Sequence, residues 1–314
     1  MDAGKYVHFD GELVPRDEAK IHVFTPAVRF GAHVFEGIRA YWNEDAEELY
    51  VFRLAEHLER MRHGMKVMRY DRIPSVAEME AIVLDCIRAN EHRGDIGIRL
   101  SAYVVGDGFI DASSPISLMC GTEAGAAKGI EDKKIRTMVT SWQRISDNAM
   151  PGRLKCAANY QNGRLGLMQA RDAGFDEAIF LTPEGKVAEG AGACIFMIRG
   201  GQPATPPITA GILESVTRDT MLTLFADKIG QPAIERQIDR TELYMAEELF
   251  FCGSAYEVHP IVDVDGISVG EGEVGPVSAS VWDHYEALVR GQVPDHPEWR
   301  TPVYGSQGVE AAAE

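Results

Sequence analysis

The chain has 314 residues, about twice the length of a typical domain, and its 45% hydrophobic content is enough for one large or two medium cores. The formal net charge of −17 produces a negative field that repels nucleic acid and anionic membranes. No apolar run approaches the roughly 20 residues that a membrane-spanning helix needs. We also find no signal-peptide pattern and no C-x-x-C pair among the five cysteines, so we expect a cytoplasmic enzyme of small molecules without a metal site.

The first 120 residues predict a small α+β domain. Asp10-Gly11 separates two short strand-like runs, as in a tight hairpin. Apolar residues recur with a helical period between residues 54 and 68, and Ser75-Val76-Ala77-Glu78 has the capping-box pattern that begins a helix. We therefore expect two helices, at residues 54–68 and from 75 onward, and strands at 6–9, 12–14, 48–52, 96–105 and 116–120.

Residues 121–133 begin with small, flexible residues, and we interpret them as an interdomain loop. Residues 134–314 then form the predicted larger C-terminal domain. Its expected strands are 135–142, 177–181, 194–198, 249–252 and 258–264, and its expected helices are 160–173, 216–229 and 278–289. The polar tail after Gly291 is expected to be loose.

Lys155 lies among small and apolar residues, whereas we expect the other eight lysines to be solvated. Desolvation disfavours the charged form of a lysine and so lowers its pKa, which makes a neutral amine available at neutral pH. Such an amine can form a Schiff base with an aldehyde cofactor such as pyridoxal phosphate. The ordinary alternative is a surface lysine with a buried stem, so the prediction depends on the neighbouring motifs.

Three features are candidates for binding the phosphate of such a cofactor. Residues 213–219 lead from a loop into a helix, where free N–H groups and the Thr217 hydroxyl attract an anion. Ser254 follows a glycine in a turn after an apolar strand, and Arg60 lies beside the apolar stripe of its helix. The corresponding alternatives are a helix cap, a plain hairpin and an exposed ion pair.

Two further residues fit the aromatic ring of the cofactor. Glu189 is followed by glycine between two apolar segments, so its carboxylate is a candidate partner for the pyridine nitrogen. Tyr160 is a candidate donor to the phenolic oxygen. A solvated turn glutamate and a packing tyrosine remain the alternatives.

Taken in chain order, these motifs resemble those of the class IV aminotransferases, most of all the branched-chain amino acid aminotransferases. The resemblance covers roughly residues 5–290. It rests on Phe35-Glu36-Gly37-Ile38-Arg39, Glu56-His57-Leu58-Glu59-Arg60, Lys155 with Asn159-Tyr160, Glu189-Gly190-Ala191-Gly192, Val216-Thr217-Arg218-Asp219 and Gly253-Ser254-Ala255-Tyr256-Glu257. It implies the α+β fold-type IV architecture of the D-amino acid aminotransferases, with a small α+β domain and a larger pseudo-barrel domain, in a homodimer or higher homo-oligomer.

The resemblance also implies pyridoxal 5'-phosphate as cofactor and ping-pong transfer of an amino group from a branched-chain or other hydrophobic L-amino acid to 2-oxoglutarate. Lys155 is then the Schiff-base lysine and the acid/base. Binding of the cofactor is implied for Arg60, Tyr160, Glu189, Leu213, Val216, Thr217 and Ser254, and binding of the substrate for Phe30, Phe35, Gly37, Arg99 and Ala255.

Several positions depart from the branched-chain pattern. Phe30 and Gly97 stand where tyrosines are usual, Cys120 and Glu123 stand where we expect aromatic residues, and Ser215 and Cys194 replace a usual glycine and asparagine. The lost hydroxyls and added volume favour an alternative, a transaminase of (R)-amines or D-amino acids, whereas Arg99 favours a substrate with a distal carboxylate. A lyase such as aminodeoxychorismate lyase and a cofactor-binding protein without turnover complete the set of hypotheses.

Overall fold

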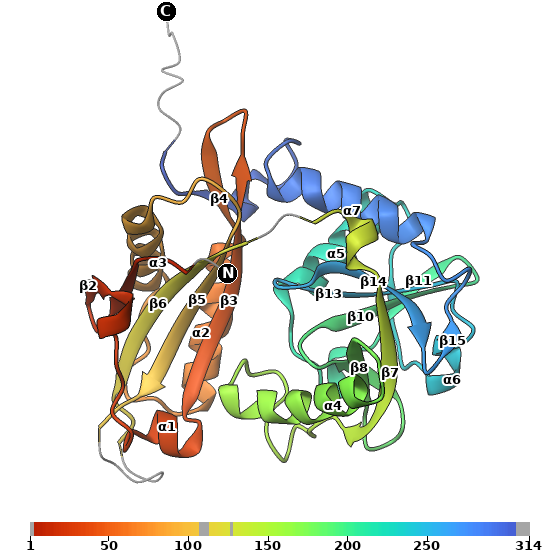
Figure 1. Ribbon diagram of the computed structural model, residues 1–314, viewed down its shortest axis with the longest axis horizontal. Helices are drawn as coiled ribbons and strands as arrows, with labels where there is room; N and C mark the ends of the chain where they lie inside the picture. Colours follow the sequence, from red (N-terminus) through yellow and green to blue (C-terminus); the bar gives the residue numbers. More distant parts are fainter. Residues whose placement is uncertain (1–2, 107–112, 126–127, 306–314) are drawn as a thin grey trace, which may run out of the picture. The chain divides into compact units, whose positions relative to one another are not determined.

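The computed structural model describes residues 3–106, 113–125 and 128–305. The chain divides into two compact units, one of residues 1–127 with 286–314 and one of residues 128–285. Each unit combines a β-sheet with helices (Figure 1), which confirms the predicted α+β class. No helix in the described ranges is both long and apolar enough to cross a membrane.

The first unit is built on a seven-stranded sheet with the order β16-β4-β3-β5-β6-β1-β2 (Figure 1). Its strands are β1 (Tyr6–Phe9), β2 (Glu12–Pro15), β3 (His33–Asn43), β4 (Glu48–Phe52), β5 (Ile96–Val104), β6 (Ile116–Ala124) and β16 (Arg300–Pro302). Its helices are α1 (Pro26–Phe30), α2 (Leu54–Val67) and α3 (Val76–Asn90). Helices α2 and α3 pack on one face of this sheet.

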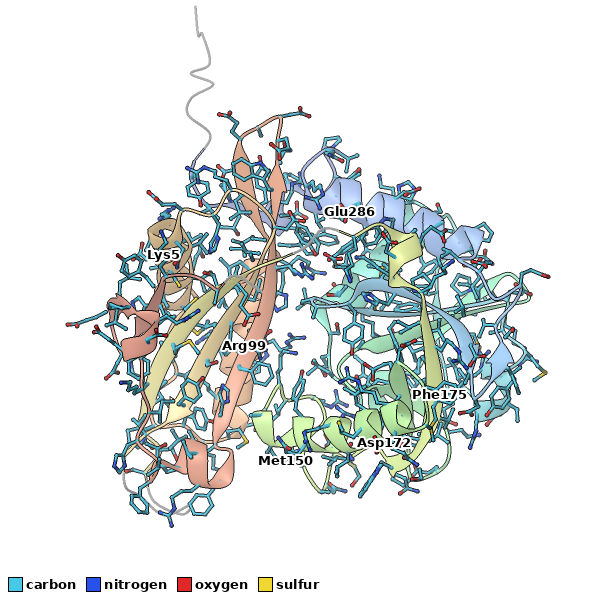
Figure 2. All side chains as sticks on the ribbon, viewed as in Figure 1. Lys5, Arg99, Met150, Asp172, Phe175 and Glu286 are labelled. Atoms are coloured by element: carbon cyan, nitrogen blue, oxygen red, sulfur yellow. The ribbon has the colours of Figure 1, made fainter. Side chains whose placement is uncertain are left out.

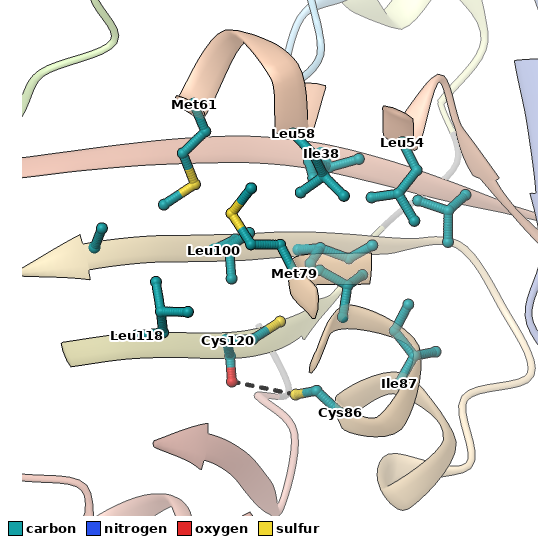
Figure 3. Close-up of a cluster of buried hydrophobic side chains, with 14 of the residues drawn as sticks. Ile38, Leu54, Leu58, Met61, Met79, Cys86, Ile87, Leu100, Leu118 and Cys120 are labelled. Carbon is teal, nitrogen blue, oxygen red and sulfur yellow. Dashed lines mark hydrogen bonds between the residues drawn. The ribbon is translucent and has the colours of Figure 1, made fainter. Parts of the chain in front are cut away.

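Strand alternation decides which residues of this sheet enter the core. Ile38 and Leu100 point toward α2 and α3 and contact apolar side chains such as Met61 and Met79 there (Figure 3). Because successive side chains of a strand point to opposite faces, Phe35 and Arg99 lie on the other face. The predicted substrate residues of β3 and β5 therefore share one face.

The second unit contains a curled nine-stranded sheet with the order β12-β11-β10-β13-β14-β7-β8-β9, and β15 pairs with β14. Its strands are β7 (Ile135–Gln143), β8 (Glu177–Leu181), β9 (Val187–Gly190), β10 (Cys194–Arg199), β11 (Gln202–Thr205), β12 (Ile234–Glu235), β13 (Glu248–Gly253), β14 (Glu257–Val264) and β15 (Ile267–Ser268). Its helices are α4 (Tyr160–Asp172), α5 (Val216–Asp227) and α6 (Arg240–Leu243), and α7 (Pro276–Val289) continues from it into the first unit.

Close packing of helices on strands fixes the second unit. Helix α5 places Phe225 against Phe196 and Phe250, whose rings stack at 5.2 Å. Helix α4 approaches β8 so closely that a Cβ on Gly166 would lie 2.2 Å from the Phe180 ring. A glycine is therefore required at residue 166, because any larger residue would push α4 away from the sheet.

The start of the expected interdomain loop and the end of the expected larger domain both differ from our prediction. β6 pairs with β5 as far as Ala124, so residues 121–124 are strand and not loop. Residues 290–302 pack in the first unit, where β16 pairs with β4 and Arg290 forms an ion pair with Asp95 at 2.8 Å. The pairings of these two segments are made by backbone hydrogen bonds and by a distant acidic residue. The small and polar side chains of the segments therefore do not indicate them. Residues 126–127 of the expected loop lie outside the described residues.

Lys133 corrects a second expectation. It ends the 3-10 turn Ile130–Lys133, is only 4% exposed, and pairs with Glu257 of β14. Its ammonium group also lies 3.8 Å from the centre of the Trp282 ring. A charged lysine is buried here because an acid 124 residues away neutralises it, which a local sequence pattern does not reveal.

Candidate active site

Lys155 lies in the loop between β7 and α4, and hydrogen bonds within this loop hold its position. The buried Asn159 donates from Nδ2 to the carbonyl oxygens of Pro151, at 2.9 Å, and Leu154, at 3.1 Å. Gly152 packs against the backbone of Gly211, and a Cβ at residue 152 would lie 2.2 Å from the Gly211 oxygen. The loop that carries the lysine is therefore fixed against the loop that precedes α5.

The amine of Lys155 has a specific hydrogen-bond partner. The side chain is half-buried, and Nζ donates to the hydroxyl oxygen of Tyr160 at 2.7 Å. Tyr160 is the first residue of α4, so the helix fixes the position of the hydroxyl. A lysine and a tyrosine paired in this way can exchange a proton or bind the same group.

Glu189 is a buried carboxylate on β9, with partners on both of its oxygens. Oε1 forms an ion pair with the guanidinium of Arg144 at 2.5 Å, and Oε2 accepts from the backbone N–H of Leu213 at 3.2 Å. Burial raises the pKa of Glu189, while Arg144, the Leu213 N–H and Lys155 act in the opposite direction. The loop before α5, which donates to Glu189 through Leu213, also packs against the lysine loop at Gly152.

The first turn of α5 follows Leu213. Ser215 caps this helix, and its hydroxyl accepts from the N–H of Arg218 at 3.3 Å. Val216 and Thr217, the next two residues, are buried. The twelve-residue α5 thus presents its N-terminal N–H groups and the Thr217 hydroxyl beside the loop that contacts Glu189.

Ser254 and Ala255 lie in the turn that follows β13, the former half-buried and the latter exposed. Cys194 of β10 pairs directly with Cys252 of β13, which brings the start of one strand beside the end of the other. A Cβ on Gly253 would lie 3.6 Å from the Gly192 oxygen, so the turns 190–193 and 254–256 are neighbours. The second unit therefore brings together the predicted residues of the lysine loop, β9, the α5 N-terminus and this turn.

The other predicted residues belong to the first unit. Gly37 and Arg99 are opposite each other on β3 and β5, and the Arg99 guanidinium lies 4.3 Å from the centre of the Phe35 ring (Figure 2 labels Arg99). Phe30 ends α1 and is exposed, with the Arg29 guanidinium 4.8 Å from its ring centre. Phe35, Gly37 and Arg99 thus form one group on one sheet face.

Arg60 differs from the exposed ion pair that we weighed as its alternative. Its Nε and Nη2 atoms donate to the two oxygens of the fully buried Glu36, at 2.8 and 2.6 Å. Burial alone would raise the pKa of Glu36, but the Arg60 charge and the His57 hydrogen bond outweigh it and lower that pKa to about 2. Glu36 therefore holds Arg60 in one orientation on α2.

A known protein family matches the part of the chain that contains these residues. The family model described as amino-transferase class IV matches residues 33–264, which include the lysine loop, β9, α5 and the turn after β13. The chain belongs to this family.

Individual class IV aminotransferases are similar over nearly the whole chain. A probable branched-chain-amino-acid aminotransferase of Aquifex aeolicus is 38% identical over 306 residues, which are 95% of this chain and 97% of that relative. The crystal structure of the Thermoproteus uzoniensis branched-chain aminotransferase with norvaline has a TM-score of 0.91 at 38% identity, over 96% of this chain and 100% of that one. The branched-chain amino acid aminotransferase of Thermobaculum terrenum, in its PLP-bound holo-form, has a TM-score of 0.90 at 37% identity, over 96% and 99%.

The positions that depart from the branched-chain pattern lie in different environments in this aminotransferase. Cys120 is fully buried in the core of the first unit, where its carbonyl oxygen accepts from Cys86 Sγ (Figure 3), so it cannot line a substrate pocket. Gly97 and Glu123 instead pair with each other on the face that carries Arg99. Cys194 lies beside Glu189, at 3.8 Å between Sγ and Oε2.

Sequence reasoning gave no role in the site to three side chains of this aminotransferase: Arg144, Glu177 and Tyr256. Arg144 contacts Glu189, and Glu177 is a buried acceptor for the Tyr256 hydroxyl. Arg144 and Glu177 each sit at an end of an expected strand, where a charged residue is normally solvated. Only the tertiary pairing of the strands brings each of them to its partner.

Proposed function

We propose that this aminotransferase moves the amino group of a branched-chain or other hydrophobic L-amino acid to 2-oxoglutarate, with pyridoxal 5'-phosphate as cofactor and a ping-pong mechanism. The observation that carries the proposal is the hydrogen bond of Lys155 to Tyr160 in the same unit as the buried Glu189. Lysine, phenol and carboxylate are the three groups that such a cofactor requires besides its phosphate donors.

The residues present fit this cofactor. A helix N-terminus and the hydroxyls of Thr217 and Ser254 suit a phosphate, and a buried carboxylate suits a protonated pyridine nitrogen. When bound, pyridoxal phosphate supplies an aldehyde for a Schiff base and an aromatic ring that withdraws electrons from the substrate.

Each side chain then has one task. Lys155 would hold the cofactor aldehyde as a Schiff base and would serve as the acid/base that carries the proton at the substrate Cα, and Tyr160 would donate to the phenolic oxygen. Glu189, held by Arg144, faces the ring nitrogen. Leu213 would pack against the ring, and Arg60, Thr217, Ser254 and the N–H of Val216 would hold the phosphate.

The substrate is assigned from the first unit and from the relatives. Phe35 and Gly37 offer an apolar surface with open space, since a Cβ on Gly37 would meet nothing within 4 Å. Arg99 on the same face suits the distal carboxylate of glutamate or 2-oxoglutarate. Phe30 and Ala255 complete the proposed substrate contacts. Norvaline is bound by the Thermoproteus uzoniensis relative, which supports an amino acid with an apolar side chain as donor.

We propose further that the enzyme works in the cytoplasm as a homodimer or a higher homo-oligomer. This assembly is a property that the resemblance implies.

A specific departure favours one alternative. Phe30 and Gly97 leave a less polar and wider surface than tyrosines would, which suits an (R)-amine or D-amino acid. Initial rates with 2-oxoglutarate separate the two functions when L-leucine, D-alanine and (R)-1-phenylethylamine are tested singly as donors. We expect turnover with L-leucine alone. Faster turnover with D-alanine or the (R)-amine would replace the proposed function by the alternative.

A further inference from the structure

One buried carboxylate connects the two turns that flank the proposed site. Glu177, 5% exposed at the start of β8, accepts a hydrogen bond from the hydroxyl of Tyr256 through Oε2. Oε1 accepts from the backbone N–H of Ala178 at 2.9 Å, and the backbone N–H of Ala191 lowers the pKa of this carboxyl group. Ala191 lies in the turn after Glu189, and Tyr256 in the turn that carries Ser254.

Tyr256 is held on several sides. Its ring lies edge-on to the Phe251 ring, with centres 6.2 Å apart, and its Cε2 atom would be 3.8 Å from a Cβ on Gly192. Its carbonyl oxygen is hydrogen-bonded to His259 Nδ1. The tyrosine therefore bridges from the turn 254–256 across the turn 190–193 to β8.

We propose that Tyr256 and Glu177 are positioning residues that hold the turn 254–256 against the turn 190–193, so that Ser254 and Ala255 meet cofactor and substrate in fixed geometry. The proposal rests on the proposed function for the roles of Ser254 and Ala255. Neither Tyr256 nor Glu177 performs chemistry, so their loss weakens binding without slowing the proton transfer at Lys155.

The protonation of the pair supports this role. Burial raises the pKa of Glu177 and, together with the Glu177 carboxylate, raises the pKa of the Tyr256 hydroxyl well above its usual range. A raised pKa favours the protonated hydroxyl, which is the form that donates to Glu177. The hydrogen bond from the Tyr256 hydroxyl to the buried Glu177 therefore connects the turn 254–256 to β8.

The test compares Tyr256→Phe with Tyr244→Phe in the full-length holoenzyme. Tyr244 is a matched control, since it lies in the same unit and its hydroxyl donates to Asp265 at 2.8 Å. Three quantities are measured: hydrogen exchange of the backbone amides, the dissociation constant of pyridoxal phosphate, and the separate kcat and KM for L-leucine.

For Tyr256→Phe we expect faster amide exchange at residues 190–193 and 254–257. We also expect the cofactor dissociation constant and KM to rise about tenfold, because one hydrogen bond to Glu177 is lost. We expect kcat to stay within about threefold, because the proton transfer is unaffected. Exchange, KM and cofactor affinity equal to those of Tyr244→Phe would overturn the proposal. A fall in kcat at unchanged KM would also overturn it.

If Tyr256→Phe does not fold, Glu177→Ala and Glu177→Gln decide. The glutamine keeps an oxygen that accepts from Tyr256, so it should preserve exchange and KM much better than the alanine. Equal effects of the two substitutions would overturn the proposal. Amide exchange needs no turnover, so a wild-type protein without transaminase activity would refute the proposed function while the exchange result still tests the link.

Discussion

Glu189 has a named partner on each carboxyl oxygen, and a buried carboxyl group of this kind suits a pyridine nitrogen. Arg144 forms an ion pair with one oxygen at 2.5 Å, and the Leu213 N–H donates to the other. The Arg144 Nε atom also donates to the Gly211 carbonyl at 3.2 Å, so the same arginine connects Glu189 to the loop before α5. These contacts fix the direction of the carboxyl group, and they oppose the rise in its pKa that burial causes.

Glu189→Gln tests this role. The amide keeps the shape of the side chain, so cofactor binding should persist, but it cannot balance a protonated ring nitrogen. We expect kcat to fall by about a hundredfold, the usual effect of removing one electrostatic stabiliser. Glu184→Gln, in the exposed turn after β8, is the control and should leave kcat unchanged. An unchanged kcat in Glu189→Gln would show that another group protonates the ring.

Sequence reasoning located residues that act within short motifs and missed those that act through distant partners. Lys155 and Tyr160 are five residues apart, and the structure pairs them. Arg144 and Glu189, by contrast, meet across 45 positions of the chain, and Lys133 meets Glu257 across 124. Local composition does not reveal such pairs, since a charged residue at a strand end resembles a solvated one.

At the scale of elements, the Glu36–Arg60 pair joins β3 to α2. Sequence periodicity did not indicate β3 as a strand, because Glu36 and Arg39 interrupt its apolar pattern. The structure accounts for Glu36, whose charge is buried under α2 and matched by Arg60. Strand β5 and helix α2 were predicted because their apolar residues follow the strand and helix periods.

The low pKa of Glu36 makes the stability of this unit depend on pH. The folded pKa of about 2 lies below the ordinary value of 4.5, so ionised Glu36 stabilises the fold above pH 4.5, and this contribution is lost as pH falls toward 2. Between pH 5 and pH 3, we expect the free energy of unfolding of the wild type to fall by about 2 kcal/mol more than that of Glu36→Gln.

Urea unfolding at the two pH values measures this difference. Glu59→Gln is the control, because Glu59 pairs with Arg62 at the exposed surface of the same helix and should follow the wild type. Parallel pH dependence in the wild type and Glu36→Gln would contradict the assigned role of the Glu36 charge.

At the scale of the whole molecule, the chain is predicted well as two α+β units and poorly where it crosses between them. The tail after Gly291 is polar, yet β16 pairs with β4, and Arg53 lies 4.3 Å from the centre of the Trp299 ring. Non-local strand pairing, the aromatic contacts of Trp299 and hydrogen bonds from Val303 and Tyr304 to Glu48 stabilise this segment. None of these leaves a periodic signal in ten residues of sequence.

The central claim is that Lys155 binds a pyridoxal cofactor that accepts the amino group of an L-amino acid. The most direct test is the near-visible absorbance of the protein after incubation with pyridoxal phosphate, recorded before and after L-leucine is added without a keto acid. Lys155→Ala is the test variant. Lys186→Ala is its control, since Lys186 pairs with Asp239 in a partly exposed position away from the motif.

We expect a yellow band in the wild type and in Lys186→Ala that fades when L-leucine is added, and no such change in Lys155→Ala. A wild-type protein without a yellow band, or one whose band L-leucine and L-glutamate leave unchanged, would contradict the account, as would equal fading in Lys155→Ala.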